Sequence, residues 1–156
     1  MAVLQRLQAS LIGNRWALVP LRIVVGFGFA SHGYAKLARG PEHFAVIVNA
    51  MGIPGPHTMA WLTTLLELGG GIALMLGLLV IPFAVPLGVI MATAMFGVHA
   101  QYGFSSVRLK AITDAGAQFG PIGYELPLLY IVALVALALA GATPLSLDRW
   151  FAARRR

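Results

Sequence analysis

Four apolar runs, each roughly twenty residues long, constrain the fold of this chain more than any other feature of its sequence. They cover residues 16–37, 58–80, 83–102 and 124–141. Hydrophobic residues make up 59% of the 156-residue sequence and charged residues only 10%, with a mean hydropathy of +0.84. A helix of about 20 apolar residues crosses about 30 Å of hydrocarbon, whereas this composition does not suit a soluble domain. The sequence therefore predicts an all-α integral membrane protein, a four-helix transmembrane bundle.

The two ends of the chain differ from the apolar runs. Residues 1–15 place leucines at helical spacing among basic and amide side chains, which predicts a short amphipathic N-terminal helix at the membrane interface. A cleaved secretory signal is the alternative, but the apolar run that follows is long and lacks a clean small-residue cleavage site. We expect residues 16–148 to form one membrane domain and residues 149–156 a basic cytoplasmic tail.

The distribution of charge predicts how the bundle is oriented. The formal net charge is +6, and most basic residues flank the spans at the two termini. Four spans place both termini on the same side, and the excess of Lys and Arg there makes that side cytoplasmic. Basic residues beside membrane spans indicate topology and contact with anionic lipid, so the lipid bilayer is the expected partner and nucleic acid is not.

The absence of cysteine limits the chemistry of the chain. It excludes disulfides, thiol catalysis and iron–sulfur ligation by this protein. No His-x-x-x-His or Glu-x-x-His spacing occurs, so we predict no metal site from the sequence motifs. Any redox chemistry must therefore come from a cofactor or a partner protein.

Arg22 and Glu67 stand out because they lie inside predicted spans. An ionisable group there costs about 2.5–3.5 kcal/mol on insertion scales, so it needs a partner or water. A rise of about 1.5 Å per residue places the two side chains about 5–10 Å apart in depth, a gap that an arginine can bridge. We expect a buried pair, either functional, gating protons or positioning an anionic or quinone-like ligand, or structural, fixing the register of the helices.

The same arithmetic places polar residues from three spans in one layer near the outer membrane surface. His32 and His99 are predicted to bind a ligand, transfer protons or, as a less favoured alternative, ligate haem or a metal. They are otherwise interfacial histidines bonded to neighbours or water. Lys36 and Glu125 either act in catalysis or recognise substrate from the aqueous face. Otherwise they are a snorkelling lysine and an acid near a helix N-terminus. The candidate catalytic residues are Glu67, His32 and His99, and the candidate ligand-binding residues are Arg22, Lys36, Tyr102 and Glu125.

Short motifs follow one another in a fixed order between residues 18 and 148. They are Leu21-Arg22 with Gly26, His32-Gly33, Lys36-Leu37, Glu67-x-Gly-Gly, His99 with Gly103-Phe104, Gly123-Tyr124-Glu125-Leu126 and Ser146-Leu147-Asp148. In order and spacing they resemble the DoxX family of small four-span proteins. The resemblance implies a bundle in the bacterial inner membrane. Family members or close relatives include a subunit of an archaeal thiosulfate:quinone oxidoreductase and a mycobacterial protein that assembles with a sulfurtransferase and a superoxide dismutase in thiol-oxidative stress defence.

Two functions follow as hypotheses. The first is a membrane subunit of an oxidoreductase system whose polar interior, open toward the periplasm, binds a quinone or another small redox-active ligand. Histidines and acids would exchange protons, Glu67 foremost, while a redox partner protein or cofactor carries electrons. The alternative is a non-catalytic scaffold that docks soluble redox or stress-defence enzymes. Transport of a small solute is less favoured, because four spans leave little room unless the chain forms a homo-oligomer.

Overall fold

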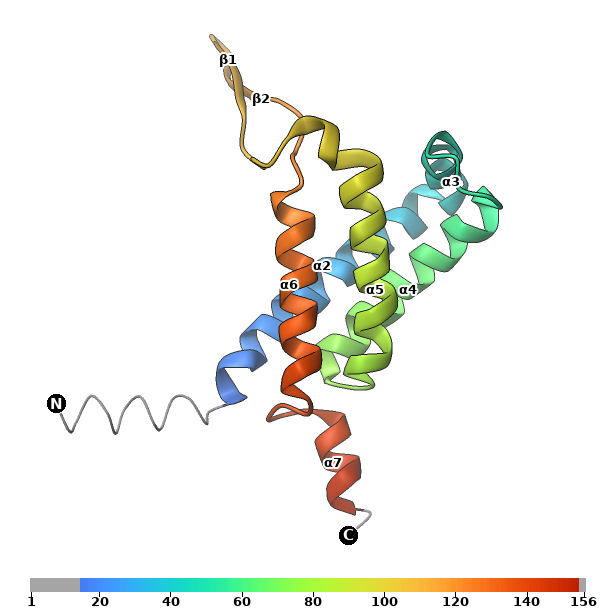
Figure 1. Ribbon diagram of the computed structural model, residues 1–156, viewed down its shortest axis with the longest axis vertical. Helices are drawn as coiled ribbons and strands as arrows, with labels where there is room; N and C mark the ends of the chain where they lie inside the picture. The colour runs from blue at the N-terminus through green and yellow to red at the C-terminus, as the bar shows by residue number, and fades with distance from the viewer. Residues whose placement is uncertain (1–14, 155–156) are drawn as a thin grey trace, which may run out of the picture.

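The computed structural model describes residues 15–154, and it is built from helices (Figure 1). Four helices form the bundle: α2 (Leu18–Arg39), α4 (Pro56–Leu76), α5 (Val80–Ala94) and α6 (Glu125–Ala140). The all-α membrane fold expected from the sequence is confirmed. The interfacial helix expected over residues 1–15 falls almost entirely outside the described residues.

Within residues 15–154, three helical segments are long and apolar enough to cross a membrane. They are Arg15–Arg39, Pro56–Leu76 and Val80–Tyr102. The fourth bundle helix, α6, is equally apolar but has 16 residues, or about 24 Å of rise, against about 30 Å of hydrocarbon. The four predicted runs thus correspond to four packed helices, of which three have full spanning length.

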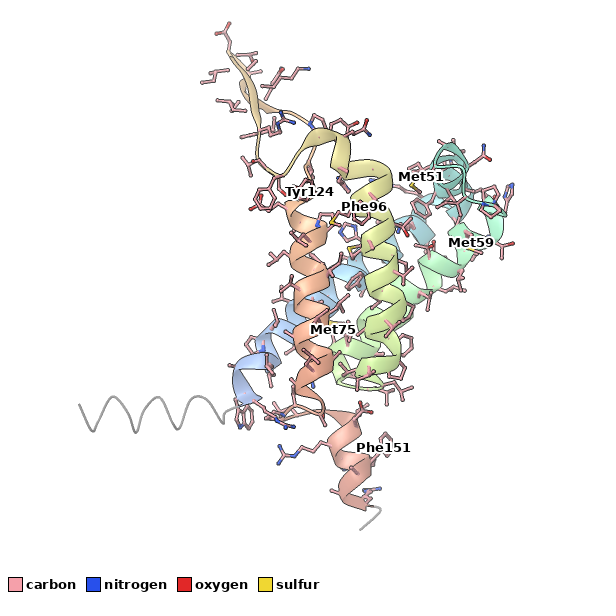
Figure 2. All side chains as sticks on the ribbon, viewed as in Figure 1. Met51, Met59, Met75, Phe96, Tyr124 and Phe151 are labelled. Carbon is pink, nitrogen blue, oxygen red and sulfur yellow. The ribbon has the colours of Figure 1, made fainter. Side chains whose placement is uncertain are left out.

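Shorter elements connect the bundle helices. They are η1 (Arg15–Ala17), α3 (Pro41–Ala50), the π-helical η2 (Met95–His99), η3 (Ala100–Tyr102), β1 (Leu109–Thr113), β2 (Gly116–Phe119) and α7 (Leu147–Arg154). Segments η2 and η3 continue α5 to the end of the predicted third span. The pattern of residues 44–51 predicts a short amphipathic helix in the connector after the first span, and α3 lies there. Met51, at its C-terminal end, lies against Gly97 of η2, so α3 contacts both α4 and the extension of α5 (Figure 2).

Glycines set the close packing of α2 on α4. A Cβ atom at Gly26 would lie 2.6 Å from the carbonyl oxygen of Gly71, and one at Gly33 would overlap the backbone of Leu68. Helices approach this closely in membranes only where small residues face one another. The two backbones are therefore locked in one register, which decides which polar side chains meet.

The common core of the four helices lies toward the end of the bundle at which α4 and α6 end and α5 begins. It contains Phe29 from α2, Leu74 from α4, Leu87 from α5 and Leu134 from α6, all fully or almost fully buried. Phe29 packs edge-on against Tyr130 of α6 with 5.2 Å between the ring centroids. This cluster joins α5 and α6 to the α2–α4 pair.

The glycine-rich composition of residues 103–122 predicts an exposed loop, but the structure forms an antiparallel hairpin of β1 and β2 there. The segment also contains apolar and β-branched residues that favour strands. The turn lies at residues 114–115, beside Gly116, whose φ of 113° favours glycine. The hairpin is exposed, as expected, and projects from the end of α5 and α6 opposite α7 (Figure 1).

Candidate functional site

A buried ion pair joins the first two long helices. Lys36 Nζ of α2 lies 2.5 Å from Glu67 Oε2 of α4. The pair forms here because Gly33, one turn before Lys36, lets the α2 backbone touch α4 at Leu68, next to Glu67. The Glu67 side chain is 2% exposed and that of Lys36 is 19% exposed. The carboxylate is thus enclosed, and the ammonium is the member that solvent or a ligand can reach.

Helix α3 covers this pair. The Lys36 ammonium lies 4.2 Å from the centroid of the Phe44 ring, in a cation–π contact. A small apolar cluster, which includes the buried Ala45 and Val48 of α3 and Ala60 of α4, holds α3 against α4. The Lys36–Glu67 pair therefore lies at the junction of three helices.

A second polar contact fastens α3 to the start of α4. His57 Nδ1 donates a hydrogen bond to one oxygen of the Glu42 carboxylate, and Trp61 Nε1 donates to the other at 3.3 Å. The hydrogen bond from His57 lowers the pKa of the exposed Glu42 carboxyl below its ordinary value. Glu42 is consequently ionised at neutral pH and stays available as an acceptor for both side chains.

The predicted pair of Arg22 with Glu67 is wrong. Arg22 Nη1 donates to Thr143 Oγ1 at 2.6 Å, and Nη2 donates to the Leu145 carbonyl at 2.9 Å. The guanidinium lies against Gly77, ten positions after Glu67, which corresponds to about 15 Å along a helix. The packing register of α2 and α4 therefore places Arg22 too far from Glu67, and Glu67 pairs with Lys36 instead.

Arg22 is a structural anchor in this arrangement. It is 2% exposed, and its partners lie in the segment between α6 and α7. Its Nε is buried without a hydrogen-bond partner among the residues that the structure describes. A side chain at Gly77, which has φ 65°, would collide with the guanidinium. Arg22 thus ties the start of α2 to the chain that follows α6.

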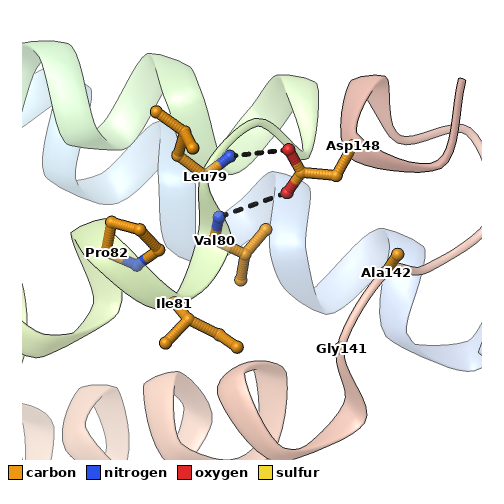
Figure 3. A pocket seen from close by; sticks show the side chains of 7 residues that line it. All are labelled: Leu79, Val80, Ile81, Pro82, Gly141, Ala142 and Asp148. Atoms are coloured by element: carbon orange, nitrogen blue, oxygen red, sulfur yellow. Dashed lines mark hydrogen bonds between the residues drawn. The ribbon is translucent and has the colours of Figure 1, made fainter. Parts of the chain in front are cut away.

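Asp148 performs a related task nearby, and reasoning from the sequence did not select it as a site residue. Its carboxylate accepts hydrogen bonds from the backbone N–H groups of Leu79, at 3.0 Å, and Val80, at 3.5 Å (Figure 3). These groups begin α5, and no intrahelical acceptor exists for them. Asp148 therefore caps α5 from a distant part of the chain. The Ser-Leu-Asp motif was the only sequence signal for it.

A shallow pocket of about 250 Å³ adjoins this cap (Figure 3). Its lining is apolar apart from Asp148, and both carboxylate oxygens already accept backbone hydrogen bonds. The pocket is lined by residues at the start of α5, after α6 and in α7, whereas Lys36 and Glu67 lie on other helices. We therefore locate the candidate site at the ion pair and not at this pocket.

The two histidines predicted to act together have different surroundings. His32 is exposed on α2. His99 is partly buried at the end of η2, and its Nδ1 donates to the Ile122 carbonyl at 2.9 Å. Within residues 15–154, Lys36–Glu67 is the one hydrogen bond or ion pair that joins two predicted site residues. No group of three or more His, Asp or Glu side chains among those residues is arranged to hold a metal ion.

The remaining predicted site residues lie at the root of the hairpin. The Tyr102 carbonyl accepts a hydrogen bond from the Arg108 guanidinium. The Glu125 carboxylate accepts one from the Ser106 N–H at 2.9 Å. These contacts connect the end of the α5 extension and the start of α6 to residues 106–108, which precede β1. These residues, together with His99, position the connection between α5 and α6.

The fold and the site define a small helical membrane bundle with one enclosed acid–base pair between its first two long helices. The chain matches DoxX over residues 17–100, and it belongs to that family. Two proteins of Haemophilus influenzae, both described as uncharacterized, are similar to it. One is 34% identical over 133 residues, 84% of this chain and 87% of the relative. The other is 30% identical over 141 residues, 88% and 84% of the two chains. No solved structure matches significantly.

Proposed function

We propose that this DoxX protein is the membrane subunit of an oxidoreductase system and that it binds a quinone-like ligand at the Lys36–Glu67 pair. One observation carries the proposal: a partly exposed ammonium rests on an enclosed carboxylate beside an aromatic ring. Charge placed this deep in a helical bundle is costly, which makes it a default candidate for function.

The residues present suit a quinone. A Lys ammonium has three N–H donors, and Glu67 accepts from one, so the others are available to a carbonyl oxygen. The Phe44 ring beside the ammonium offers an apolar surface to a flat ring system. A bound quinone would supply reversible uptake of two electrons and two protons. Lys36 would hold a proton at Nζ close to the ligand, and Glu67 would keep that proton in place.

His32 completes the proposed site from the solvent side. It precedes Lys36 by four residues, so both side chains lie on the same side of α2. The exposed imidazole can both donate and accept a hydrogen bond, and in this proposal it would return protons to Lys36. We assign His99, Tyr102, Glu125 and Arg22 to positioning, because each of them bonds to a connecting segment of the chain.

The proposal includes an orientation and a partner. Basic residues concentrate at the two chain ends, which we place in the cytoplasm of a bacterial cell, with α3 and the hairpin on the periplasmic side of the inner membrane. Electrons would reach the ligand from a separate redox protein, because the chain lacks cysteine and would use the bound ligand for redox chemistry.

A non-catalytic scaffold is the second candidate, and the root of the hairpin favours it. His99, Arg108 and Glu125 are all engaged in holding the connection from which the exposed hairpin projects. A scaffold needs such a rigid exposed element and would use Lys36–Glu67 only to hold α2 on α4.

Measuring quinone binding by matched variants distinguishes the ligand-binding subunit from the scaffold. The full-length chain, reconstituted in nanodiscs containing ubiquinone or menaquinone, is analysed by native mass spectrometry for bound quinone. Lys36→Met combined with Glu67→Leu removes both charges together, which a buried pair often tolerates. We expect this variant to fold and to bind quinone about tenfold more weakly or worse, as loss of a charged hydrogen bond predicts. Arg39→Met, at the exposed end of α2, is the control for general loss of basic charge.

Unchanged quinone binding in the folded double variant would reject the ligand site and leave the scaffold. Retained binding in the Arg39→Met protein, with loss in the double variant, would support the ligand site.

A further inference from the structure

The hairpin has one apolar face, and a bulge creates it. Leu109 pairs with Phe119, and Ile112 pairs with Ala117, while the register shifts around Lys110. Directly paired side chains lie on the same face, and alternation along β2 puts Ala117 and Phe119 on one face. In a regular strand, Leu109 and Ile112 would point to opposite faces. The extra residue in the bulge brings them to the same one.

The opposite face of the hairpin carries small and polar side chains. It is formed by the pairs Ala111–Gln118 and Thr113–Gly116. The hairpin is therefore amphipathic, which is expected of a sheet that covers something on one side.

The apolar face has no cover in the described chain. Ile112 is 79% exposed, Phe119 is 60% exposed and Leu109 is 57% exposed. The hairpin extends away from the helices beyond the end of α5 and α6, which also directs it away from the lipid around those helices (Figure 1). A lone two-stranded hairpin is marginally stable in water, and a contiguous exposed apolar surface on a rigid root indicates an interaction site.

We propose that this face packs against the same face of a second copy of the chain. Two copies inserted in the same direction are related by a two-fold axis along the membrane normal, which is the closed symmetry typical of homodimers. That rotation places β1 of one copy over β2 of the other. The large Ile112 then lies over the small Ala117 of the second copy, and Leu109 lies over Phe119. The face is thus complementary to itself in shape.

The charges favour the same arrangement. Strand β2 carries no charged residue, whereas β1 contains Lys110 and follows Arg108. The two-fold rotation places the two Lys110 residues at opposite edges, each over the uncharged strand of the other copy. Pairing edge to edge through β1 would instead bring the lysines together, and a bulged edge that carries lysine discourages such pairing.

The size of the face determines how the dimer behaves. Four side chains from each copy bury far less than the roughly 1,200 Å² of a stable interface. Association therefore depends on the shared orientation and high effective concentration of copies in one membrane. This inference is independent of the proposed ligand site, because it involves neither Lys36 nor Glu67.

Cysteine cross-linking tests the inference, and the absence of native cysteine makes it clean. Ile112→Cys and Thr113→Cys are neighbouring exposed positions on opposite faces of the hairpin. Each full-length variant is treated with a short bismaleimide in native membrane vesicles, and the products are identified by mass. A monofunctional maleimide in parallel measures the reactivity of each thiol. We expect a homodimer several-fold more abundant from Ile112→Cys than from Thr113→Cys at equal thiol reactivity.

A second variant keeps the apolar side chains in place. Ala117→Cys leaves Ile112, Leu109 and Phe119 intact, and it should cross-link like Ile112→Cys. Mixed Ile112→Cys and Ala117→Cys copies should form a heterodimeric product most readily.

Three outcomes would overturn the inference. One is equal or preferential cross-linking through position 113. Another is a product of different mass from 112 and 117, which would assign the face to another protein. The third is a thiol at 112 that a soluble maleimide labels slowly and that gives no dimer, which would assign the face to lipid.

Discussion

Two basic residues on one helix, Arg22 and Lys36, have partners of different kinds. Lys36 meets a carboxylate and keeps part of its surface exposed, whereas Arg22 is fully enclosed and donates to two neutral oxygens. An ion pair with one enclosed and one partly exposed member can exchange a proton or a ligand. An enclosed guanidinium that donates to a hydroxyl and a carbonyl holds two segments together and is not accessible to a ligand. Position along the same helix thus separates a candidate site from a structural anchor.

The largest effect should come from Arg22→Ala. This substitution removes two hydrogen bonds that the charged guanidinium donates, and it leaves the Thr143 hydroxyl and the Leu145 carbonyl without that donor. It also creates a void, so we expect the free energy of unfolding to fall by about 3 kcal/mol or more. Arg22→Lys should recover little, because one ammonium cannot replace the planar fork. Unfolding in mixed detergent micelles measures the change, with Arg39→Ala as control. An Arg22→Ala protein as stable as wild type would contradict the structural role of Arg22 and its contrast with Lys36.

The next largest effect distinguishes loss of one member of the Lys36–Glu67 pair from loss of both. Glu67→Leu alone leaves the Lys36 ammonium without its counter-ion and should cost about 2 kcal/mol, less than a fully buried charge because Lys36 is partly exposed. Adding Lys36→Met should recover most of that loss. The same unfolding assay on the two single variants and the double gives the coupling energy. Additive losses would show that the two residues stabilise α2 and α4 independently.

A smaller effect is expected at the cap of α5. Asp148→Ala leaves the Leu79 and Val80 N–H groups without their acceptor, which should cost about 1 kcal/mol, as for other helix caps. The segment after α6 should also become more sensitive to protease. Asp148→Asn should recover part of the stability, since its amide oxygen can accept one of the bonds. Equal proteolysis of wild type and Asp148→Ala would contradict the cap.

The smallest effect concerns pH and the attachment of α3. The pKa of Glu42 is lowered in the folded protein by the hydrogen bond from His57, so its contribution is present above the unfolded value and is lost as pH falls through the folded pKa. Amide hydrogen exchange in α3, corrected for the intrinsic pH dependence, should therefore increase only under strongly acidic conditions. In Glu42→Gln the exchange should be faster at neutral pH and lack this acid step. His43→Gln, on the same helix, is the matched control.

The sequence is sufficient to predict where the helices lie along the chain but not the register in which α2 and α4 pack. Hydropathy located four apolar runs, and each corresponds to a bundle helix. The depth of Arg22 and Glu67 was inferred from helix length alone, but contacts of Gly26 with Gly71 and of Gly33 with Leu68 decide how far α2 is displaced along α4. Because of this displacement, the partner of Glu67 is Lys36 and not the predicted Arg22. Register of this kind depends on the packing of both helices at once, which single-residue patterns do not contain.

Two further features depended on contacts distant in sequence. Asp148 caps a helix that begins at Val80, and a capping motif read locally assigns an acid only to the helix that it precedes. The hairpin lay in a segment rich in glycine, where apolar residues at spacings of three and seven show no strand alternation because of the bulge at Lys110. His32 and His99 were grouped by depth, and depth does not determine the direction in which a side chain points.

The Arg22 anchor has a consequence for biosynthesis. A chain made from its N-terminus inserts α2 long before Thr143 and Leu145 leave the ribosome, so the guanidinium has no native acceptor while the other bundle helices are made. During that interval the first hydrophobic segment must remain beside the insertion machinery or next to water. Released chains truncated after residue 142 should consequently be recognised by membrane quality-control proteases, although they contain the residues of every bundle helix.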